Sequence, residues 1–124
     1  MTPRLFTKAK TLALSNGHDY HLVAILQRRK QIIRVGTNSY KTHPKYPRYY
    51  RTGPKLVYHL HAEMAVLRFA QPGDKILVLR FKADGSLSMG RPCIECQKHI
   101  KAAGIREVEY SDWDGNIVRL EDVE

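Results

Sequence analysis

The segment RPCIECQKHIKAAGI, from Arg91 to Ile105, contains the only two cysteines of the chain, Cys93 and Cys96. A proline stands directly before the first cysteine, and the residues that follow suit a helix that Gly104 ends. Positions i and i+3 lie on the same face of a helix. We therefore expect both sulfurs to point to the same side, at the start of a helix over residues 92–103.

A pair of cysteines at this spacing, in a domain without a secretion signal, favours metal binding or catalysis over a structural disulfide. The start of a helix also favours the thiolate form that a metal ion needs. Catalytic zinc sites use three protein ligands and leave the fourth position to water. His61, in the upstream stretch HAE, completes such a set with Cys93 and Cys96. We expect one zinc ion per chain, with water or hydroxide as its fourth ligand.

Glu63 lies two residues after His61 and is not needed to complete the ligand set. A free carboxylate beside such a water can take a proton from it and return that proton to a leaving nitrogen. Zinc lowers the pKa of its water to about 7, which provides hydroxide at neutral pH. We therefore predict Glu63 as the catalytic residue of a hydrolytic zinc site.

Other interpretations of the two cysteines stay open at this point. They could form a redox pair, or a structural zinc site in which His59 or His99 supplies a fourth protein ligand. The HAE stretch and the proline before Cys93 together favour the catalytic site, because a structural site leaves Glu63 without a role. A relative that has lost its activity and only binds its ligand is a further alternative.

The order of expected elements predicts one mixed α/β domain over residues 1–124. Apolar spacing and turn residues predict a helix that begins at Thr2-Pro3, strands over His21–Leu26 and Ile32–Thr37, a loop over Asn38–Tyr58, a helix over His61–Ala70, a buried strand over Lys75–Phe81, the cysteine-bearing helix, a strand over Ile105–Tyr110 and a last strand or tail over Asn116–Leu120. Helices and strands alternate in the second half, so we expect parallel crossovers there.

The whole chain has a formal net charge of +9, and its basic residues are concentrated in the first half. Residues 1–62 hold twelve Lys and Arg against one acidic residue, whereas residues 63–124 hold nine against eleven. Between Asp19 and Glu63 there is no acidic residue. A localised positive charge of this kind indicates a polyanionic partner.

The expected loop over Asn38–Tyr58 mixes aromatic and basic side chains, and loops of this length are usually functional. In a groove for single-stranded nucleic acid, basic groups contact phosphates and aromatic rings stack on bases for ~1–3 kcal/mol each. The candidate substrate contacts are Tyr40, Lys41, His43, Arg48, Tyr49 and Arg51. The alternative is a solvated basic loop that its tyrosines attach to the core.

No apolar run approaches the length of a membrane span, and the first residues, MTPRLFTKAK, lack the core of a signal peptide. We therefore expect a cytoplasmic protein without membrane contact.

HAE at residues 61–63 and PCIEC at residues 92–96 resemble the H-x-E…P-C-x-x-C signature of the zinc nucleobase deaminases. The run CIECQKHIKAAGIREV most resembles the deoxycytidylate deaminase branch, and HAEMAVL is also similar to tRNA adenosine deaminases. The resemblance covers roughly residues 20–115. It implies the three-layer α/β/α cytidine-deaminase fold, a five-stranded mixed sheet with helices on both faces. It also implies attack of water at C4 of cytosine and loss of ammonia.

The same resemblance assigns substrate contacts outside the zinc site. Asn38, at the end of the second strand, would hold the sugar, and the backbone of Ala62 would contact the base. Ser111 and Trp113 lie in a stretch, residues 111–114, that corresponds to the loop contacting the neighbouring nucleotide in APOBEC-type deaminases. The chain departs from deoxycytidylate deaminases after the second strand, where NSYKTHPKYPRYYRTGPK replaces a Gly-rich turn.

The basic and aromatic stretch exceeds what one nucleotide phosphate needs, and a base must leave its stack to reach such a zinc ion. We therefore expect a cytosine deaminase acting on single-stranded nucleic acid, with DNA favoured. The alternative is deamination of dCMP or another free cytosine nucleotide. A second alternative is a non-catalytic, zinc-stabilised module that binds nucleic acid.

Overall fold

The computed structural model describes residues 2–17, 20–38, 48–52, 55–59 and 61–120, with the backbone alone described for 48–52 and 55–59. Its elements along the chain are α1 (Pro3–Leu14), β1 (His21–Arg28), β2 (Gln31–Thr37), β3 (Arg48–Thr52), β4 (Lys55–His59), α2 (Ala62–Leu67), β5 (Lys75–Phe81), β6 (Leu87–Ser88), α3 (Ile94–Ala102), β7 (Glu107–Ser111) and β8 (Ile117–Arg119).

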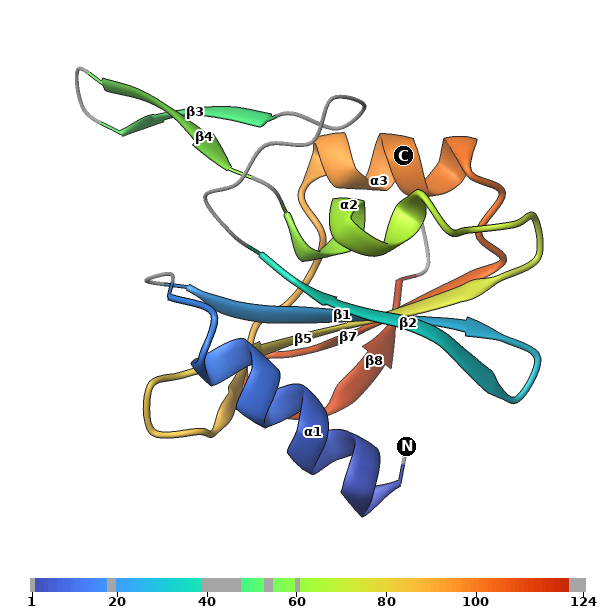
Figure 1. Ribbon diagram of the computed structural model, residues 1–124, viewed down its shortest axis with the longest axis horizontal. Helices are drawn as coiled ribbons and strands as arrows, with labels where there is room; N and C mark the ends of the chain where they lie inside the picture. Colours follow the sequence, from blue (N-terminus) through green and yellow to red (C-terminus); the bar gives the residue numbers. More distant parts are fainter. Residues whose placement is uncertain (1, 18–19, 39–47, 53–54, 60, 121–124) are drawn as a thin grey trace.

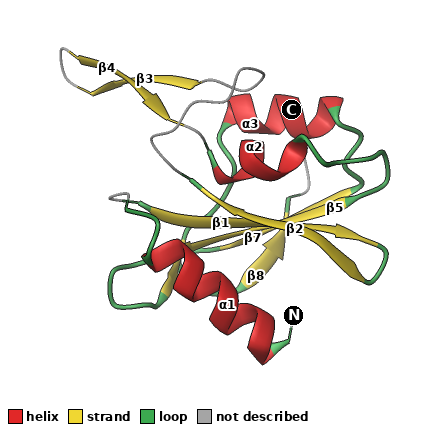
Figure 2. Ribbon diagram, in the orientation of Figure 1, coloured by secondary structure: helices red, strands yellow, loops and turns green. Residues whose placement is uncertain are grey.

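A mixed sheet in the order β2-β1-β5-β7-β8 forms the centre of the molecule, and the short strand β6 also pairs with β5 (Figure 2). Strands β5 and β7 are parallel, with Lys75 opposite Glu107, and α3 makes the crossover between them. The other pairs in this sheet are antiparallel. The predicted mixed sheet and its parallel crossover are confirmed.

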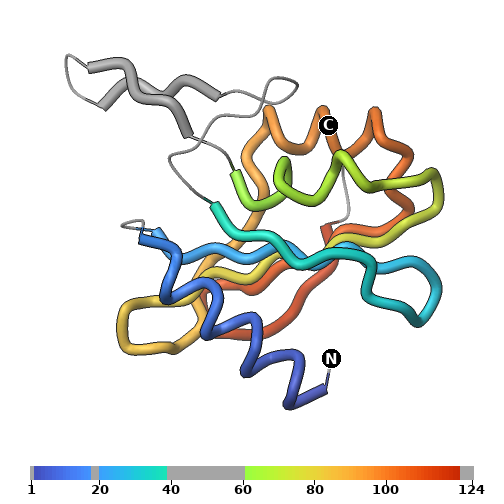
Figure 3. The backbone as a smooth tube through the Cα atoms, viewed as in Figure 1, coloured from blue at the N-terminus to red at the C-terminus, as the bar shows by residue number. Residues whose placement is uncertain are grey.

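Helices cover both faces of the sheet, with α1 on one side and α2 and α3 on the other (Figure 1). Strand β5 lies in the middle of the sheet between these layers, and its side chains alternate between the two faces. Leu77, Leu79 and Phe81 belong to the core beneath α1, whereas Ile76 and Val78 belong to the core beneath α2 and α3. This explains why KILVLRF is almost continuously apolar. The tube in Figure 3 shows the same three layers.

Helix α1 begins as its sequence predicts. Thr2 is the N-cap, and its Oγ1 accepts a hydrogen bond from the Leu5 backbone N–H at 3.1 Å. Pro3 occupies the first helical position, where its missing N–H costs nothing. After the helix, Gly17 adopts a positive φ of 71°, which glycine accepts without steric cost.

Three expectations about elements need correction. Residues 38–58, predicted as a loop, contain β3 and β4, which pair antiparallel with Arg48 opposite His59. Their runs RYYRT and KLVYH are rich in residues that favour strands, and the proline-rich surroundings concealed this. Helix α2 ends at Leu67, not Ala70, because the last N–H groups bond three residues back and tighten the turn. The sequence prediction also missed β6.

An ion pair between a partly exposed arginine and a buried carboxylate connects two segments at the end of the molecule opposite the starts of α2 and α3. The carboxylate of Asp74, which is 1% exposed, accepts hydrogen bonds from Arg28 Nε at 2.9 Å and Arg28 Nη2 at 3.0 Å. Arg28 also donates to the Phe69 carbonyl at 3.2 Å. These bonds connect the end of β1 to the segment between α2 and β5.

None of the helices in the described part of the chain combines the length and apolar character that crossing a membrane requires.

Candidate metal and active site

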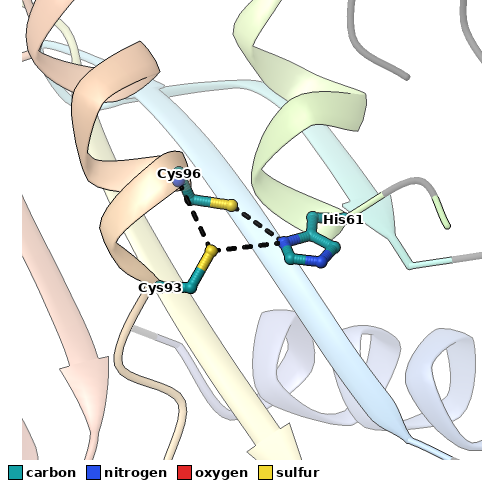
Figure 4. A group of neighbouring side chains, drawn as sticks. All are labelled: His61, Cys93 and Cys96. Atoms are coloured by element: carbon teal, nitrogen blue, oxygen red, sulfur yellow. Dashed lines mark hydrogen bonds between the residues drawn. The ribbon is translucent and has the colours of Figure 1, made fainter. Parts of the chain in front are cut away.

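His61, Cys93 and Cys96 come together where α2 and α3 begin (Figure 4). His61 is the N-cap of α2, and Cys93 is the N-cap of α3, with Cys96 in its first turn. His61 Nδ1 lies 2.9 Å from Cys96 Sγ and 3.8 Å from Cys93 Sγ. Cys96 is buried and Cys93 is exposed, so the cluster reaches the surface on the Cys93 side.

The donor set fits zinc. Zn–N and Zn–S bonds of about 2.0–2.1 and 2.3 Å at tetrahedral angles place ligand atoms about 3.5 Å apart. The two measured distances lie on either side of this value, and all three donor atoms lie within 4.8 Å of one another. Among the described residues, the group that could hold a metal ion consists of His61, Cys93 and Cys96. His99 is not part of it, which disfavours its role as a fourth ligand.

Without a bound ion, the pKa values of the two cysteine thiols are shifted in opposite directions. A hydrogen bond with Cys96 lowers the pKa of Cys93 to about 3, and His61 adds to this effect. The same hydrogen bond, followed by burial and the charge of Glu63, raises the pKa of Cys96. A metal ion binds cysteines as thiolates and must displace any proton that they carry, so metal affinity increases with pH.

Glu63 is buried in the first turn of α2, with 4% of its surface exposed. Burial raises its pKa, and the neighbouring His61 ring and a hydrogen bond with Cys96 act in the opposite direction. A raised pKa suits a carboxyl group to accept and return a proton. The structure thus places a buried carboxyl group beside the three metal donors.

Strand β2 packs closely on α2 beside this cluster. A Cβ at Gly36 would lie 2.9 Å from both Ala65 Cβ and Val66 Cγ1, and 3.6 Å from the Ala62 carbonyl. The absence of a side chain at Gly36 therefore sets the distance between β2 and the start of α2. Ala62 itself is fully buried, and its predicted backbone contact with the base stays a prediction.

Asn38 follows β2 and is 5% exposed. Its Oδ1 accepts hydrogen bonds from the Leu22 backbone N–H at 3.0 Å and from Asn16 Nδ2 at 2.8 Å, and its Nδ2 donates to the Tyr20 carbonyl at 3.1 Å. These bonds fix the end of β2 to the start of β1. The predicted contact of Asn38 with the sugar stays a prediction.

Ser111 and Trp113 have different positions. Ser111 is the last residue of β7, not part of a turn, and its buried hydroxyl donates to the Ser88 carbonyl at 2.6 Å. This placement favours a structural role for that hydroxyl. Trp113 is 67% exposed in the turn before β8. Since Gly90 N donates to Ser111 O at 2.7 Å, this turn begins beside the segment that leads into Cys93.

The remaining candidates cannot be placed relative to the site. Tyr40, Lys41 and His43 lie outside the described residues. Arg48, Tyr49 and Arg51 lie on β3, whose backbone is described but whose side chains are not. The same holds for His59 on β4.

Gln97 is a residue that the sequence interpretation missed. It follows Cys96, is 2% exposed, and donates from Nε2 to the Pro92 carbonyl at 2.8 Å. This bond fixes the segment that carries Cys93. Its Oε1 is buried without a hydrogen-bond partner among the described residues. No spacing in the sequence signals this role, because the burial of the amide and its bond to Pro92 appear only in the folded chain.

Solved structures of dCMP deaminase from the cyanophage S-TIM5 resemble this chain. The apo enzyme superposes with a TM-score of 0.53 at 22% identity, covering 91% of this chain and 86% of that one. The same enzyme in complex with dCMP and dUMP gives a TM-score of 0.56 at 19% identity, covering 91% and 85%. No protein-family model and no curated protein sequence matches the chain.

The fold and the metal-donor cluster can each be compared with these deaminases. The chain has the α/β/α fold of these deaminases, as the sequence predicts, and its His-Cys-Cys cluster fits the zinc deaminase motif.

Proposed function

We propose that the chain is a zinc-dependent hydrolytic deaminase that converts cytosine to uracil. The observation that carries this proposal is the convergence of three zinc-compatible donors with a buried acid–base carboxyl, Glu63. A structural zinc site needs neither an exposed ligand side nor such a carboxyl. The shared fold with dCMP deaminases adds support.

His61, Cys93 and Cys96 would hold the ion, which supplies a Lewis acid that makes water nucleophilic at neutral pH. Glu63 takes a proton from the water as its oxygen bonds to C4 of the cytosine. It then gives a proton to the amino nitrogen, so that the C4–N bond breaks and ammonia leaves. The net reaction adds one water and releases one ammonia, without any change of oxidation state.

For the substrate, we propose cytosine in single-stranded DNA. The support is the charge distribution: residues 1–62 are strongly basic, whereas residues 63–124 hold more acidic than basic residues. Phosphates bind such a surface along a strand. A single strand also presents its bases without the cost of unpairing a duplex.

Deamination of free dCMP is the second candidate, favoured by the similarity to an enzyme solved with dCMP and dUMP. One panel at low salt separates the candidates by mass spectrometry. It offers dCMP, deoxycytidine, a cytosine-containing single strand and its duplex. Conversion of the single strand but not dCMP supports the first candidate, and conversion of dCMP alone supports the second. A protein that binds zinc and the strand but converts nothing is the non-catalytic module.

A further inference from the structure

Two arginines from different elements contact one aromatic ring on the α2 face of the sheet. The guanidinium carbon of Arg34, on β2, lies 4.0 Å from the centroid of the Phe69 ring. That of Arg68, at the end of α2, lies 4.7 Å from the same centroid. Phe69 is partly buried and packs on the core, so its ring is a fixed support for both charges.

Neither guanidinium forms an ion pair with an acidic side chain in the described part of the chain. The nearby hairpin turn adds two more exposed cations, Arg29 and Lys30. Like charges held close together repel each other, and a bound anion relieves that repulsion. A guanidinium stacked on a ring still directs its N–H groups outward in the planar fork that matches a phosphate.

The arginine pair and the metal donors lie along the same contact between α2 and β2, which we call the α2–β2 seam, but apart from each other on it. Strand β2 runs along α2, since Gly36 meets Ala65 and Val66. His61 stands at one end of α2 and Arg68 at the other. The six residues of this helix span about 9 Å at 1.5 Å per residue. A ligand that contacts both the metal site and the arginine pair must therefore extend over at least this distance.

We propose that Arg34 and Arg68, supported by Phe69, form a phosphate-binding subsite for single-stranded nucleic acid that extends from the zinc site along the α2–β2 seam. This inference rests on the proposed function, and it names residues that would bind the polynucleotide substrate. It assigns to these arginines the phosphates beyond the target nucleotide. In this proposal the subsite strengthens binding of strands that extend past the target nucleotide.

The test compares the double variant Arg34→Gln/Arg68→Gln with the control Lys82→Gln/Arg119→Gln. The control removes the same charge at exposed positions, one after β5 and one on β8, the strand at the opposite edge of the sheet from β2. Affinity for a single-stranded oligonucleotide is measured across a salt series. Each phosphate contact contributes about 0.7 to the slope of log K against log salt. We expect the arginine variant to reduce that slope by about 1.4, with a clearly smaller change for the control.

Equal slopes for the two double variants would overturn the subsite. The subsite would also be overturned if the arginine variant lost as much affinity for polyglutamate as for the oligonucleotide, because that result would show a general attraction for acidic polymers. A wild-type protein that deaminates dCMP but binds no oligonucleotide at low salt overturns the subsite and leaves the deaminase function standing. A protein that deaminates nothing but shows the arginine-dependent slope keeps the subsite and loses the enzyme. Reduced turnover on long strands with unchanged turnover on dCMP supports both.

Discussion

Glu63 is both buried and ionisable, and burial destabilises the charged form of its carboxyl group. Its pKa is raised above 4.5 mainly by burial. The unfolded chain therefore loses this proton at a lower pH than the folded protein does. Stability is highest while Glu63 is protonated and falls as pH rises from about 4.5 through the raised pKa. The proposed proton carrier thus destabilises the metal-free fold at neutral pH.

We therefore predict that Glu63→Gln raises the melting temperature of the metal-free protein at pH 7 and has little effect near pH 4. The amide has almost the same shape but no charge to bury. Thermal unfolding of both proteins at the two pH values checks this. A variant that is less stable at pH 7 would show that the Glu63 charge is fully compensated in the fold.

Gln97 provides a second prediction at the residue scale. Gln97→Leu removes its hydrogen bond to the Pro92 carbonyl and also removes the unpartnered Oε1. We expect these effects to offset each other in stability to within about 1 kcal/mol, since one bond contributes about that much. Zinc retention in a chelator competition is expected to fall, because Cys93 loses its positioning. The control is Lys98→Gln at an exposed position on the same helix. Unchanged retention would make Gln97 a packing residue only.

The sequence made the metal donors and Glu63 recognisable because the two cysteines lie three residues apart at the start of α3 and His61 and Glu63 stand together in the HAE stretch. Gln97, Arg34 and Phe69 could not be recognised in this way. Their roles depend on contacts between separate elements, which no local spacing encodes.

At the scale of elements, the contact between β2 and α2 sets the shape of the site. We predict that Gly36→Ala costs about 1–3 kcal/mol of unfolding free energy, because its methyl group would lie 2.9 Å from Ala65 Cβ and Val66 Cγ1. Urea unfolding measures this cost. In the double variant Gly36→Ala/Ala65→Gly the costs are expected to be less than additive, since the clash with Ala65 is removed. Simple additivity would mean that this contact does not set the spacing.

The elements with strong local signals followed the sequence prediction closely. The cap at Thr2 fixed the start of α1, and the apolar run Lys75–Phe81 coincides with β5. Two of the errors have identifiable causes. The prolines around β3 and β4 concealed two runs that favour strands, and Ser111 belongs to β7 because its backbone pairs with Ile117 of β8.

At the scale of the whole molecule, the pair of Arg28 and Asp74 joins the β1–β2 hairpin to the segment between α2 and β5. Burial raises the pKa of Asp74, but the hydrogen bonds and charge of Arg28 outweigh it, so the pKa lies below 3.8. Stability from this pair is therefore present above about pH 3.8 and is lost as pH falls through the lowered pKa.

We predict that Asp74→Asn costs about 2–3 kcal/mol at pH 7 and reduces the loss of stability on acidification. This loss of unfolding free energy is smaller than for a fully buried ion pair, because the Arg28 side chain is 32% exposed and stays partly hydrated. Chemical denaturation at pH 7 and at low pH measures both effects, with Asp114→Asn, at an exposed position in the turn before β8, as control. An equally acid-sensitive variant would place the responsible carboxyl elsewhere.

The central claim is hydrolysis at the zinc cluster with Glu63 as the proton carrier. The most direct measurement is the mass spectrum of the product after incubating zinc-loaded protein with single-stranded DNA and with dCMP in water enriched in heavy oxygen. The account predicts uracil that carries the heavy oxygen with the wild-type protein, and none with zinc-loaded Glu63→Gln. Equal product from the variant, or no product from a wild-type protein that holds its zinc, would contradict the account.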